Sequence, residues 1–422
     1  MNLYPHQEEA LKLIKGFNRC AIYYDMGLGK TYIGSEKMHQ LNGRVNLIIC
    51  QKSKIHDWIN HYVEHYDYHV YDLTVPRQLS EFVGKAQGER YNIVGVINYD
   101  LVWRRKELLT LTGFTMLLDE SSLITNCTAK RSKFILKLNP ENVILLSGTP
   151  TSGKYEKLWS QLQLLGWYIT EDTYWKSYVN YEWIDRDGFF DKHVLGYKNV
   201  EHLKSKLAKY GAIFKKTEEV IDLPDQVPIP ISVNQSKKYK DFVKNHYVLI
   251  GDNELIGNNV LTQILYERQL CGMYSDEKLE AFKDLVESTE DKLVVFYNFT
   301  EEWHKLKEIT DELGRPSGVV NGQFKNPEVL DEYNNGILFV QYQAGAYGLN
   351  LQKANKVIYF TLPLGLGSCD LWEQSKKRIH RIGQDQTCFY YYLLVENSIE
   401  TWNLELLKKG KELTDELFKK DV

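Results

Sequence analysis

The segment Cys20–Thr31 reads Cys20-Ala21-Ile22-Tyr23-Tyr24-Asp25-Met26-Gly27-Leu28-Gly29-Lys30-Thr31. An apolar run of the strand type leads directly into a glycine-rich turn and then into residues that open a helix. In this context the backbone N–H groups of Gly27, Leu28 and Gly29 can bind phosphate oxygens, helped by the positive potential of the helix start. Lys30 can neutralise the β- and γ-phosphates, and the Thr31 hydroxyl can ligate Mg²⁺. The segment therefore predicts a nucleotide site on a parallel α/β sheet.

The same order, a short apolar run followed by a helical pattern, recurs in the first and last thirds of the chain. This order is typical of parallel sheets with crossover helices. Ten runs are predicted to be strands: Cys20–Tyr24, Val45–Cys50, Tyr91–Ile97, Thr115–Leu118, Val143–Leu146, Leu293–Tyr297, Gly318–Val320, Ile337–Gln341, Val357–Phe360 and Phe389–Val395. We expect an α/β fold with one lobe at residues 1–166 and a second, with its linker, at residues 224–422.

Residues 167–223 lack clear strand alternation and are predicted to form a helical insertion that ends the first lobe. Pro224, Pro228 and Pro230 break helices and predict a linker after it. The insertion is rich in aromatic residues, and the spacing of Tyr174 and Tyr178 favours a packed helical face. Stacking on unpaired bases is the alternative. The chain is predicted to end in an amphipathic helix containing Ile399, Trp402, Leu406, Leu413 and Leu417.

Two carboxylates, Asp119 and Glu120, follow the apolar run Thr115–Leu118. An acidic pair at a strand end often only caps a helix. Here it follows a phosphate loop, so Asp119 is placed to hold Mg²⁺ and Glu120 to polarise an attacking water. Phosphoryl transfer needs positioned groups and neutralised charge rather than a covalent intermediate, and these residues can supply both.

A zinc site is a competing interpretation. His61-Tyr62-Val63-Glu64-His65 fits the H-x-x-E-H pattern, and its two imidazoles would share a helix face. The pattern is short and no third ligand stands out, so we favour a solvated, aromatic-rich helix end.

Composition limits the class of protein. The chain has 422 residues, of which 43% are hydrophobic and 26% charged, as in globular proteins, and its formal charge is −4. No apolar run approaches the length of a membrane span and no signal peptide is visible, so we expect no membrane association. The charge is uneven: +4 for residues 1–166, −1 for 167–223 and −7 for 224–422. A polyanion would therefore be attracted mainly by the first lobe, weakly and in a salt-sensitive way.

The order of these motifs resembles the Swi/Snf family of DNA-translocating ATPases in helicase superfamily two. Segment by segment, the resemblance comprises Asp25–Thr31 for D-x-G-L-G-K-T, Asp119–Ser122 for D-E-x-H, Leu145–Pro150 for L-T-G-T-P, Ala344–Leu351 for A-G-G-x-G-L-N-L and Glu373–Gln384 for Q-A-x-x-R-x-H-R-I-G-Q. It covers nearly the whole chain and implies two RecA-like lobes with parallel sheets flanked by helices. It also implies ATP and Mg²⁺ as cofactors, Gly348 and Gln384 at the nucleotide, and coupling through Ser147 and Thr149.

Arg378 and Arg381 are three residues apart and would share one face of a helix. A guanidinium offers planar donors to phosphate oxygens and keeps its charge. The resemblance implies that both act as arginine fingers. Taken alone, the segment would be read as an ordinary basic helix.

The sequence departs from the family pattern in several places. Tyr24 stands where the strict phosphate loop has its first glycine, and Ser122 replaces the histidine of D-E-x-H. Tyr4 and His6 replace the arginine and tyrosine of the N-terminal motif, while Gln7 remains and could pair with adenine. No departure removes a hydrolytic group.

The resemblance also implies a double-stranded DNA track. Main-chain N–H groups near Lys52, Ser53, Tyr99, Thr149 and Gln343 would meet phosphates. Basic clusters could add to it, namely Arg104-Arg105-Lys106 and Lys130-Arg131-Lys133, although a solvated face explains each equally well. No base-reading motif is evident, so binding is expected to be largely independent of sequence.

The sequence thus predicts a monomeric, ATP-dependent double-stranded DNA translocase, whose task depends on a protein partner or a specialised DNA structure. The alternatives are a strand-separating or fork-remodelling helicase and a nucleotide-gated DNA-binding scaffold. The compact motor suggests a bacterial or viral origin, and hence the cytoplasm of a bacterium or infected cell; a eukaryotic source would imply the nucleus.

Overall fold

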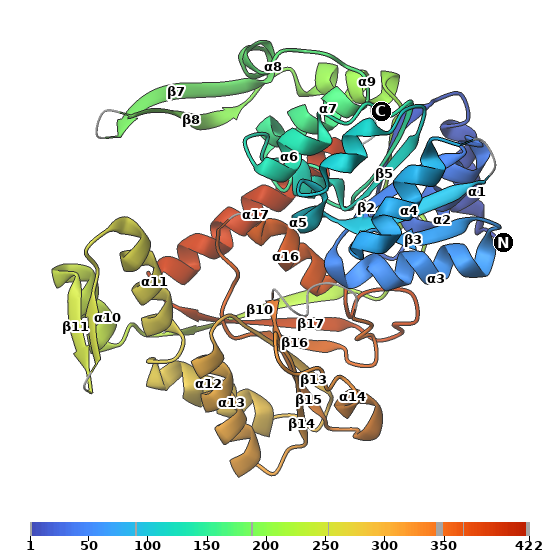
Figure 1. Cartoon of the computed structure of the whole chain (residues 1–422). Coiled ribbons are helices and arrows are strands. Elements are labelled where there is room, and N and C mark those ends of the chain that lie inside the picture. The colour runs from blue at the N-terminus through green and yellow to red at the C-terminus, as the bar shows by residue number, and fades with distance from the viewer. Residues whose placement is uncertain are drawn as a thin grey trace. The chain divides into compact units, whose positions relative to one another are not determined.

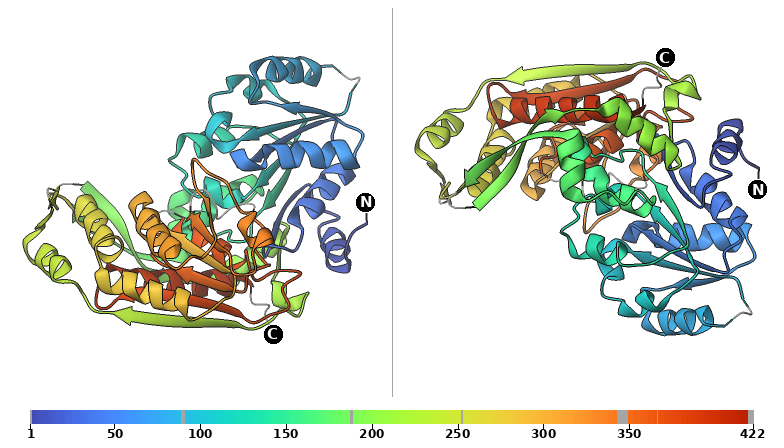
Figure 2. Two further views of the ribbon diagram at one scale, coloured as in Figure 1. Left: turned by 90° about the horizontal axis from the view of Figure 1, so that it is seen from below. Right: turned by 90° about the horizontal axis from the view of Figure 1, so that it is seen from above.

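The chain divides into two compact units, one comprising Met1–Val220 and Glu412–Val422 and the other Ile221–Lys411. The structure, a computed structural model, describes residues 2–88, 91–186, 189–251, 253–342, 349–365 and 367–418. Figures 1 and 2 show the elements of each unit from three directions.

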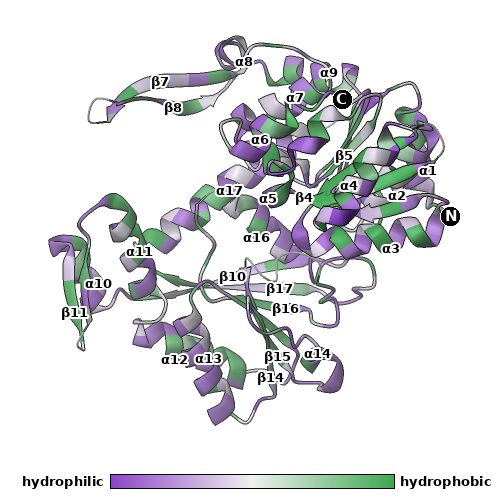
Figure 3. Cartoon of the chain, in the orientation of Figure 1, coloured by the Kyte–Doolittle hydropathy of each residue, from purple (hydrophilic) through white to green (hydrophobic). Residues whose placement is uncertain are grey.

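A seven-stranded sheet forms the centre of the first unit, in the order β3-β4-β2-β5-β6-β1-β9. Every neighbouring pair is parallel. The strands are β1 (Arg19–Tyr24), β2 (Val45–Cys50), β3 (His69–Asp72), β4 (Ile93–Asn98), β5 (Thr115–Asp119), β6 (Asn142–Leu146) and β9 (Ala212–Lys215). The five strands expected in this lobe are confirmed. Their residues are buried on both faces, which is why they appear as continuous apolar runs. Figure 3 shows these strands as hydrophobic.

Helices flank this sheet. They are α1 (Pro5–Leu13), α2 (Lys30–Gln40), α3 (Ile55–His65), α4 (Pro76–Ala86), α5 (Tyr99–Val102), α6 (Lys130–Ile135), α7 (Trp159–Leu164), α8 (Glu171–Tyr178) and α9 (Val200–Lys209), with 3₁₀ turns η1 (Lys52–Lys54), η2 (Lys106–Thr110), η3 (Ser121–Ile124), η4 (Tyr155–Leu158) and η5 (Thr217–Glu219). Helix α2 lies very close to the sheet, because a Cβ at Gly34 would come within 2.9 Å of Leu146 Cδ1. The glycine therefore sets how closely the helix that follows the phosphate loop packs on the strands.

Residues 167–223 are not a purely helical insertion, and that expectation was wrong. Helix α8 is followed by an antiparallel hairpin of β7 (Val179–Arg186) and β8 (Phe189–Tyr197), and then by α9 and strand β9. The hairpin extends from this unit in Figure 1. A signal existed, since Val179, Tyr181 and Trp183 alternate with polar residues and an Asp187-Gly188 dipeptide follows in the sequence. Strand β9 pairs with β1, and the first of the two segments that form this unit therefore runs to Val220.

The second unit has a six-stranded parallel sheet in the order β10-β17-β16-β13-β15-β14. Its strands are β10 (Gln226–Val233), β13 (Leu293–Tyr297), β14 (Ser317–Val320), β15 (Ile337–Gln341), β16 (Lys356–Tyr359) and β17 (Cys388–Val395). The five strands expected here are confirmed. The expected linker at Pro228 and Pro230 is instead the edge strand β10. Two prolines are tolerated there, because β10 is an edge strand that pairs with β17 alone in this sheet. Every second residue of an edge strand directs its backbone N–H away from the neighbouring strand, so a residue without an N–H loses no hydrogen bond there.

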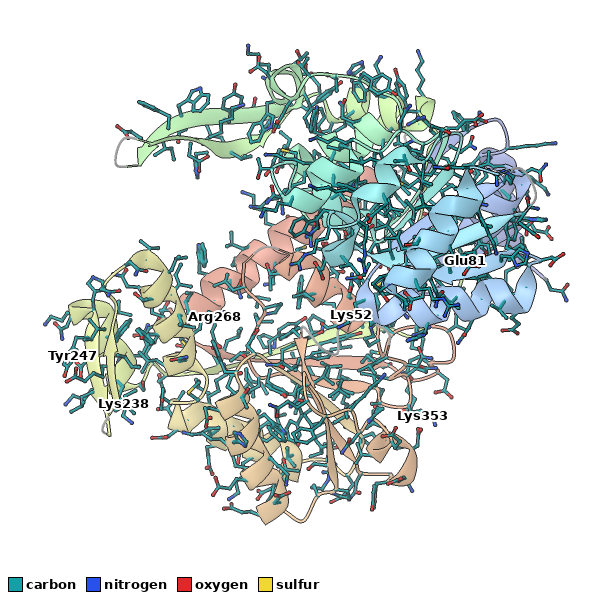
Figure 4. The ribbon with its side chains drawn as sticks, viewed as in Figure 1. Lys52, Glu81, Lys238, Tyr247, Arg268 and Lys353 are labelled. Carbon is teal, nitrogen blue, oxygen red and sulfur yellow. The ribbon has the colours of Figure 1, made fainter. Side chains whose placement is uncertain are left out.

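The helices of the second unit are α10 (Lys237–Asn245), α11 (Val260–Cys271), α12 (Asp276–Glu287), α13 (Thr300–Glu312), α14 (Val329–Glu332), α16 (Ser368–Lys376) and α17 (Ile399–Phe418). A small antiparallel hairpin, β11 (Tyr247–Ile250) and β12 (Asn253–Ile256), lies between α10 and α11. Figure 4 shows Lys238 and Tyr247 on this α10–β11 segment. Asn259 caps α11 by accepting a hydrogen bond from the Thr262 amide at 3.0 Å.

The predicted C-terminal helix is confirmed as α17, but its end belongs to the first unit, contrary to the expected 224–422 lobe. Leu413 and Phe418 pack against the first unit's core, and the Tyr155 hydroxyl donates to the Leu413 carbonyl at 2.7 Å. Among the described residues, no helix is both long enough and apolar enough to cross a membrane.

Candidate active site

The phosphate loop lies at the carboxyl end of β1. Gly27 and Gly29 have φ values of +86° and +69°, which favour glycine, and α2 begins at Lys30 as predicted. A Cβ at Gly29 would lie 2.2 Å from Gln7 Nε2, so space as well as backbone conformation requires glycine there. Lys30 Nζ donates to the carbonyl oxygens of Tyr24 at 2.7 Å and Asp25 at 3.1 Å. The ammonium is thus held at the strand end that opens into the loop.

The loop also forms hydrogen bonds with residues at the end of the edge strand β9 and just after it. The Asp25 amide donates to the Lys215 carbonyl at 2.9 Å. Asp25 Oδ2 accepts hydrogen bonds from the Thr217 amide at 3.1 Å and the Thr217 hydroxyl at 3.2 Å. Sequence reasoning missed Thr217, since nothing local links it to a residue nearly two hundred positions earlier.

Gln7 lies against the phosphate loop rather than apart from it. Its Oε1 accepts from the Tyr4 amide at 2.9 Å, and its Nε2 lies 3.4 Å from the Leu28 carbonyl. His6 Nε2 is 3.0 Å from the same carbonyl. Of the two residues that depart from the family motif, His6 thus contacts the loop, whereas Tyr4 bonds to Gln7. The predicted pairing of Gln7 with adenine stays a prediction.

Asp119 ends β5, two strands from β1 in the sheet, and therefore lies at the same edge as the phosphate loop. Its Oδ2 accepts a hydrogen bond from the buried indole Nε1 of Trp58 on α3 at 2.8 Å. Burial raises the pKa of Asp119, while the Trp58 hydrogen bond and the positive charges of Lys30 and Lys54 oppose that rise. Lys30 is thus near enough for its charge to favour the ionised form of Asp119. The sequence analysis did not predict this role of Trp58.

Glu120 has an unusual backbone conformation. Its φ of 58° and ψ of 60° lie in the left-handed region, which disfavours an L-residue with a side chain by about 1–2 kcal/mol. The Tyr99 hydroxyl lies 2.9 Å from the Asp119 carbonyl oxygen and 3.4 Å from the Glu120 carbonyl oxygen. Among the described non-glycine residues with positive φ, Glu120 is the only carboxylate. Strain of this kind persists where the surrounding structure holds it.

A second network joins the acidic pair to the Ser147–Pro150 segment. Buried Gln161 on α7 accepts hydrogen bonds from the Ser121 hydroxyl at 2.7 Å and the Tyr23 hydroxyl at 3.0 Å. Its amide nitrogen donates to the Pro150 carbonyl at 2.7 Å. Within that segment the Thr149 amide donates to Ser147 Oγ at 3.1 Å. Ser121 and Gln161 thus connect the residue after the acidic pair to Pro150 by hydrogen bonds. The coupling roles of Ser147 and Thr149 stay predictions.

The donors at this edge fit a magnesium ion. Mg²⁺ prefers oxygen ligands and uses few protein groups, with water and phosphate completing its shell. The Thr31 hydroxyl and the Asp119 carboxylate are such ligands. Among the described residues, no group of three or more His, Cys, Asp or Glu side chains could hold a metal.

The arginine motif of the second unit lies in a turn rather than on a helix, so that expectation was wrong. Helix α16 ends at Lys376, and the chain then turns so that the Arg378 carbonyl accepts from the Leu351 amide at 3.1 Å. Arg378 Nη1 donates to the Leu349 carbonyl at 3.2 Å, and Arg381 Nη1 to Asn350 Oδ1. Both arginines thus bond to the 349–351 segment just after the helix ends.

Gln384 is buried and stabilises the turn that contains Arg378 and Arg381. Its Nε2 donates to the carbonyls of Ala354 at 3.0 Å, Gln352 at 3.2 Å and Ile379 at 3.3 Å. Its predicted nucleotide contact stays a prediction. Gly348 and Gln343 lie outside the described residues.

The predicted nucleic-acid residues differ in accessibility. Lys52 and Ser53 are exposed on η1, and Figure 4 shows Lys52. Tyr99 starts α5 as expected, but its ring is buried. The Thr149 amide donates to Ser147, which leaves it less suited to a phosphate. In the basic clusters, Arg105 donates to the Thr74 carbonyl at 2.7 Å. Intramolecular contacts thus explain part of that basic surface.

The aromatic residues of 167–223 fall into two groups. Tyr174 and Tyr178 are buried in the core, which confirms the packed helical face. Trp183 and Phe190 on the β7–β8 hairpin are exposed by 59% and 70%. Lys192 Nζ lies 5.5 Å from the Trp183 ring centre, but Glu182, Asp185 and Asp191 share the hairpin. This excess of negative charge does not favour a nucleic acid on the hairpin.

His61 and His65 share a face of α3, as predicted, with ring centres 4.9 Å apart. His61 is buried and its Nε2 lies 2.8 Å from the Ser35 hydroxyl, whereas Glu64 is exposed. Burial, together with the nearby charge of His65, lowers the pKa of His61 to about 4. The arrangement is that of a buried neutral imidazole joining α3 to α2.

This pKa predicts an acid-sensitive first unit. Between pH 6.5 and 4 the unfolded chain binds a proton at His61 that the folded unit does not. Stability therefore falls as pH decreases through this window, by about 3 kcal/mol at most. Denaturant unfolding measured from pH 7 to 4 should show a shallower pH slope for His61→Gln than for wild type. His193→Gln, on the exposed strand β8, is the matched control, and an unchanged slope in His61→Gln would contradict the prediction.

Comparison with known proteins places this site in a wider group. A family model described as SNF2-related domain matches residues 6–274, and one described as helicase conserved C-terminal domain matches residues 277–383. YwqA of Bacillus subtilis (strain 168), named an ATP-dependent helicase/translocase, is 24% identical over 477 residues that cover 99% of this chain and 49% of that protein. The mouse SWI/SNF-related matrix-associated actin-dependent regulator of chromatin subfamily A member 1 is 24% identical over 426 residues, covering 89% and 39%.

The chain thus spans about half or less of the length of these curated relatives. Among solved structures, the Sulfolobus solfataricus SWI2/SNF2 ATPase core in complex with dsDNA matches with a TM-score of 0.45 and 19% identity, covering 99% of this chain and 93% of that chain.

Proposed function

The chain belongs to the SNF2-related family, and from this premise we propose that it hydrolyses ATP when bound to double-stranded DNA and translocates along the duplex. Relatives named ATP-dependent helicases support ATP as the nucleotide that is hydrolysed. The finer assignment, a translocase that moves on intact duplex, rests on the site and on the charge of the first unit.

One observation carries the ATPase assignment. The phosphate loop, with Lys30, and the Asp119–Glu120 pair end nearby strands at one edge of a single sheet, and the charge of Lys30 acts on Asp119. A cation that can neutralise phosphate thus shares this edge with a carboxylate that can hold a metal ion, and a second carboxylate is next in the chain. Phosphoryl transfer requires this combination.

The chain's own groups have defined tasks in this proposal. The loop amides and Lys30 bind the phosphates, and Thr31 and Asp119 hold Mg²⁺, which when bound neutralises charge on the β- and γ-phosphates. Glu120 orients the attacking water and accepts its proton. Trp58 fixes the Asp119 carboxylate by its 2.8 Å hydrogen bond. Arg378 and Arg381 are proposed to stabilise charge in the transition state, because a guanidinium remains protonated.

The proposal of a DNA partner is supported by the uneven charge of the chain. Residues 1–166 carry 20 Lys and Arg against 16 Asp and Glu, whereas the chain as a whole is at −4. Contacts to phosphates from a mildly basic surface give affinity that is independent of base sequence and falls as salt rises. We therefore expect weak binding to duplexes of any sequence and a steep loss between 50 and 200 mM salt.

The test is steady-state ATP hydrolysis with no DNA, with single-stranded DNA and with duplex DNA of equal length. We expect duplex to stimulate turnover most. Displacement of a third strand from an intact duplex, run beside unwinding of a labelled fork, then separates translocation from strand separation. Turnover that is indifferent to duplex would overturn the proposal, and fork unwinding without triplex displacement would favour the helicase alternative.

A further inference from the structure

We propose that Tyr99 is a positioning residue for Glu120: its hydroxyl holds the left-handed main chain that aims the Glu120 carboxylate. The inference rests on the proposed ATPase function and adds to it a residue outside the phosphate loop and the acidic pair. Tyr99 is the first residue of α5, and its ring is 2% exposed.

The argument begins with the conformation of Glu120. In the left-handed region, the Cα–Cβ bond of a residue points in a different direction from that in the helical or extended regions. A main chain that relaxed from φ 58° and ψ 60° would therefore carry the carboxylate away from its present position. Asparagine often adopts this conformation by bonding to its own backbone, but glutamate has no such local support. The neighbouring structure must supply the support.

The Tyr99 hydroxyl supplies it at the required place. The phenolic oxygen lies 2.9 Å from the carbonyl oxygen of Asp119 and 3.4 Å from that of Glu120, the two carbonyls on either side of the strained position. The Glu120 carbonyl also accepts from the Leu123 amide at 3.0 Å, which closes the first turn of η3. Removing the phenol takes away one of the contacts that hold these two carbonyls and should loosen the Asp119–Glu120 peptide.

The site itself argues for a role beyond packing. A buried phenol needs a hydrogen-bond partner, and any carbonyl would satisfy it. Here the partners belong to the two residues proposed to hold the metal ion and to accept a proton from water. Tyr174 provides the contrast: it is equally buried in the same unit, and its hydroxyl donates to the Tyr155 carbonyl at 2.7 Å, within the packed helical face.

The experiment compares Tyr99→Phe with Tyr174→Phe in the full chain. Each change removes one buried hydroxyl from a main-chain carbonyl and keeps the ring, so both should lower the unfolding midpoint to a similar extent. We expect Tyr99→Phe to lower kcat roughly tenfold, with KM for ATP and the affinity for a fluorescent ADP analogue within twofold of wild type. Tyr174→Phe should keep kcat within twofold.

A double variant tests whether the effect passes through Glu120. If Tyr99 acts by aiming that carboxylate, Tyr99→Phe added to Glu120→Gln should cause no further loss in single-turnover hydrolysis. Equal loss of kcat in Tyr99→Phe and Tyr174→Phe would overturn the positioning role, as would a loss confined to KM or a full tenfold loss added to Glu120→Gln. Wild-type hydrolysis decides the function separately: its absence with every DNA would overturn the proposed ATPase and this inference together.

Discussion

Glu120→Gln should lower ATP turnover by about 10³-fold while nucleotide affinity stays within a few-fold of wild type. The amide keeps the size of the side chain but cannot accept a proton from the attacking water. Glu120 follows the buried strand β5, and its main chain is held in the left-handed conformation, so the substitution should change chemistry rather than position. The measurement is single-turnover hydrolysis alongside binding of a fluorescent ATP analogue.

Comparing Lys30→Ala with Glu120→Gln in the same assay separates nucleotide binding from hydrolysis. Lys30 Nζ lies 2.7 Å from the Tyr24 carbonyl at the start of the phosphate loop. Its loss should remove both turnover and tight nucleotide binding, because charge on the phosphates is no longer neutralised.

For Glu120→Gln, the matched carboxylate-to-amide control is Glu81→Gln on helix α4 (Figure 4), which should leave turnover unchanged. Substantial turnover in Glu120→Gln would show that another group activates the water.

The second large effect concerns the stability of the second unit. Lys278 on α12 and Glu400 on α17 form a bidentate ion pair, with Nζ 2.5 Å from Oε1 and 2.7 Å from Oε2. Both side chains are buried, and Glu400 Oε2 also accepts from the Val395 amide at 3.0 Å. Lys278→Met leaves the Glu400 carboxylate buried without its cation, and we expect the unit to lose about 3–5 kcal/mol of unfolding free energy.

Two further variants make this prediction specific. Lys278→Met combined with Glu400→Gln removes both charges but keeps an oxygen acceptor for the Val395 amide, so most of the lost stability should return. Lys408→Met breaks an exposed pair with Glu405 on the same helix and should change stability by less than about 1 kcal/mol. The measurement is denaturant unfolding of the full chain. A double variant as unstable as Lys278→Met would show that the loss comes from packing around Lys278.

Much of the site could be predicted because its signals are local. The glycines of the phosphate loop, the lysine after them and the carboxylates after an apolar run occupy adjacent positions, and the backbone conformations that they require belong to single residues. The ten predicted strands are confirmed for the same reason, since a strand buried on both faces must be apolar throughout.

Three predictions were wrong, namely the helical insertion, the linker at Pro228 and Pro230, and the helix carrying the two arginines. The hairpin of β7 and β8 is half-exposed, so its alternation of aromatic and polar residues also fits an amphipathic helix of low regularity. Strand β10 contains prolines, which exclude an interior strand but not one at an edge. Helix α16 ends before Arg378, whose carbonyl accepts a hydrogen bond from the Leu351 amide. The partner of β10 is β17, about 160 residues along the chain, whereas the β7–β8 hairpin pairs locally.

The sequence by itself determined that this chain has two parallel α/β lobes and a phosphate loop with an acidic pair. These features depend on periodicity, glycine conformations and charges within a few residues of each other. Only the tertiary structure decided that Trp58, Tyr99 and Gln161 surround the acidic pair and that Thr217 anchors the loop. Those contacts depend on strand order, because the order β4-β2-β5-β6-β1-β9 brings together loops that lie up to about 190 residues apart. No local pattern encodes which strand ends become neighbours.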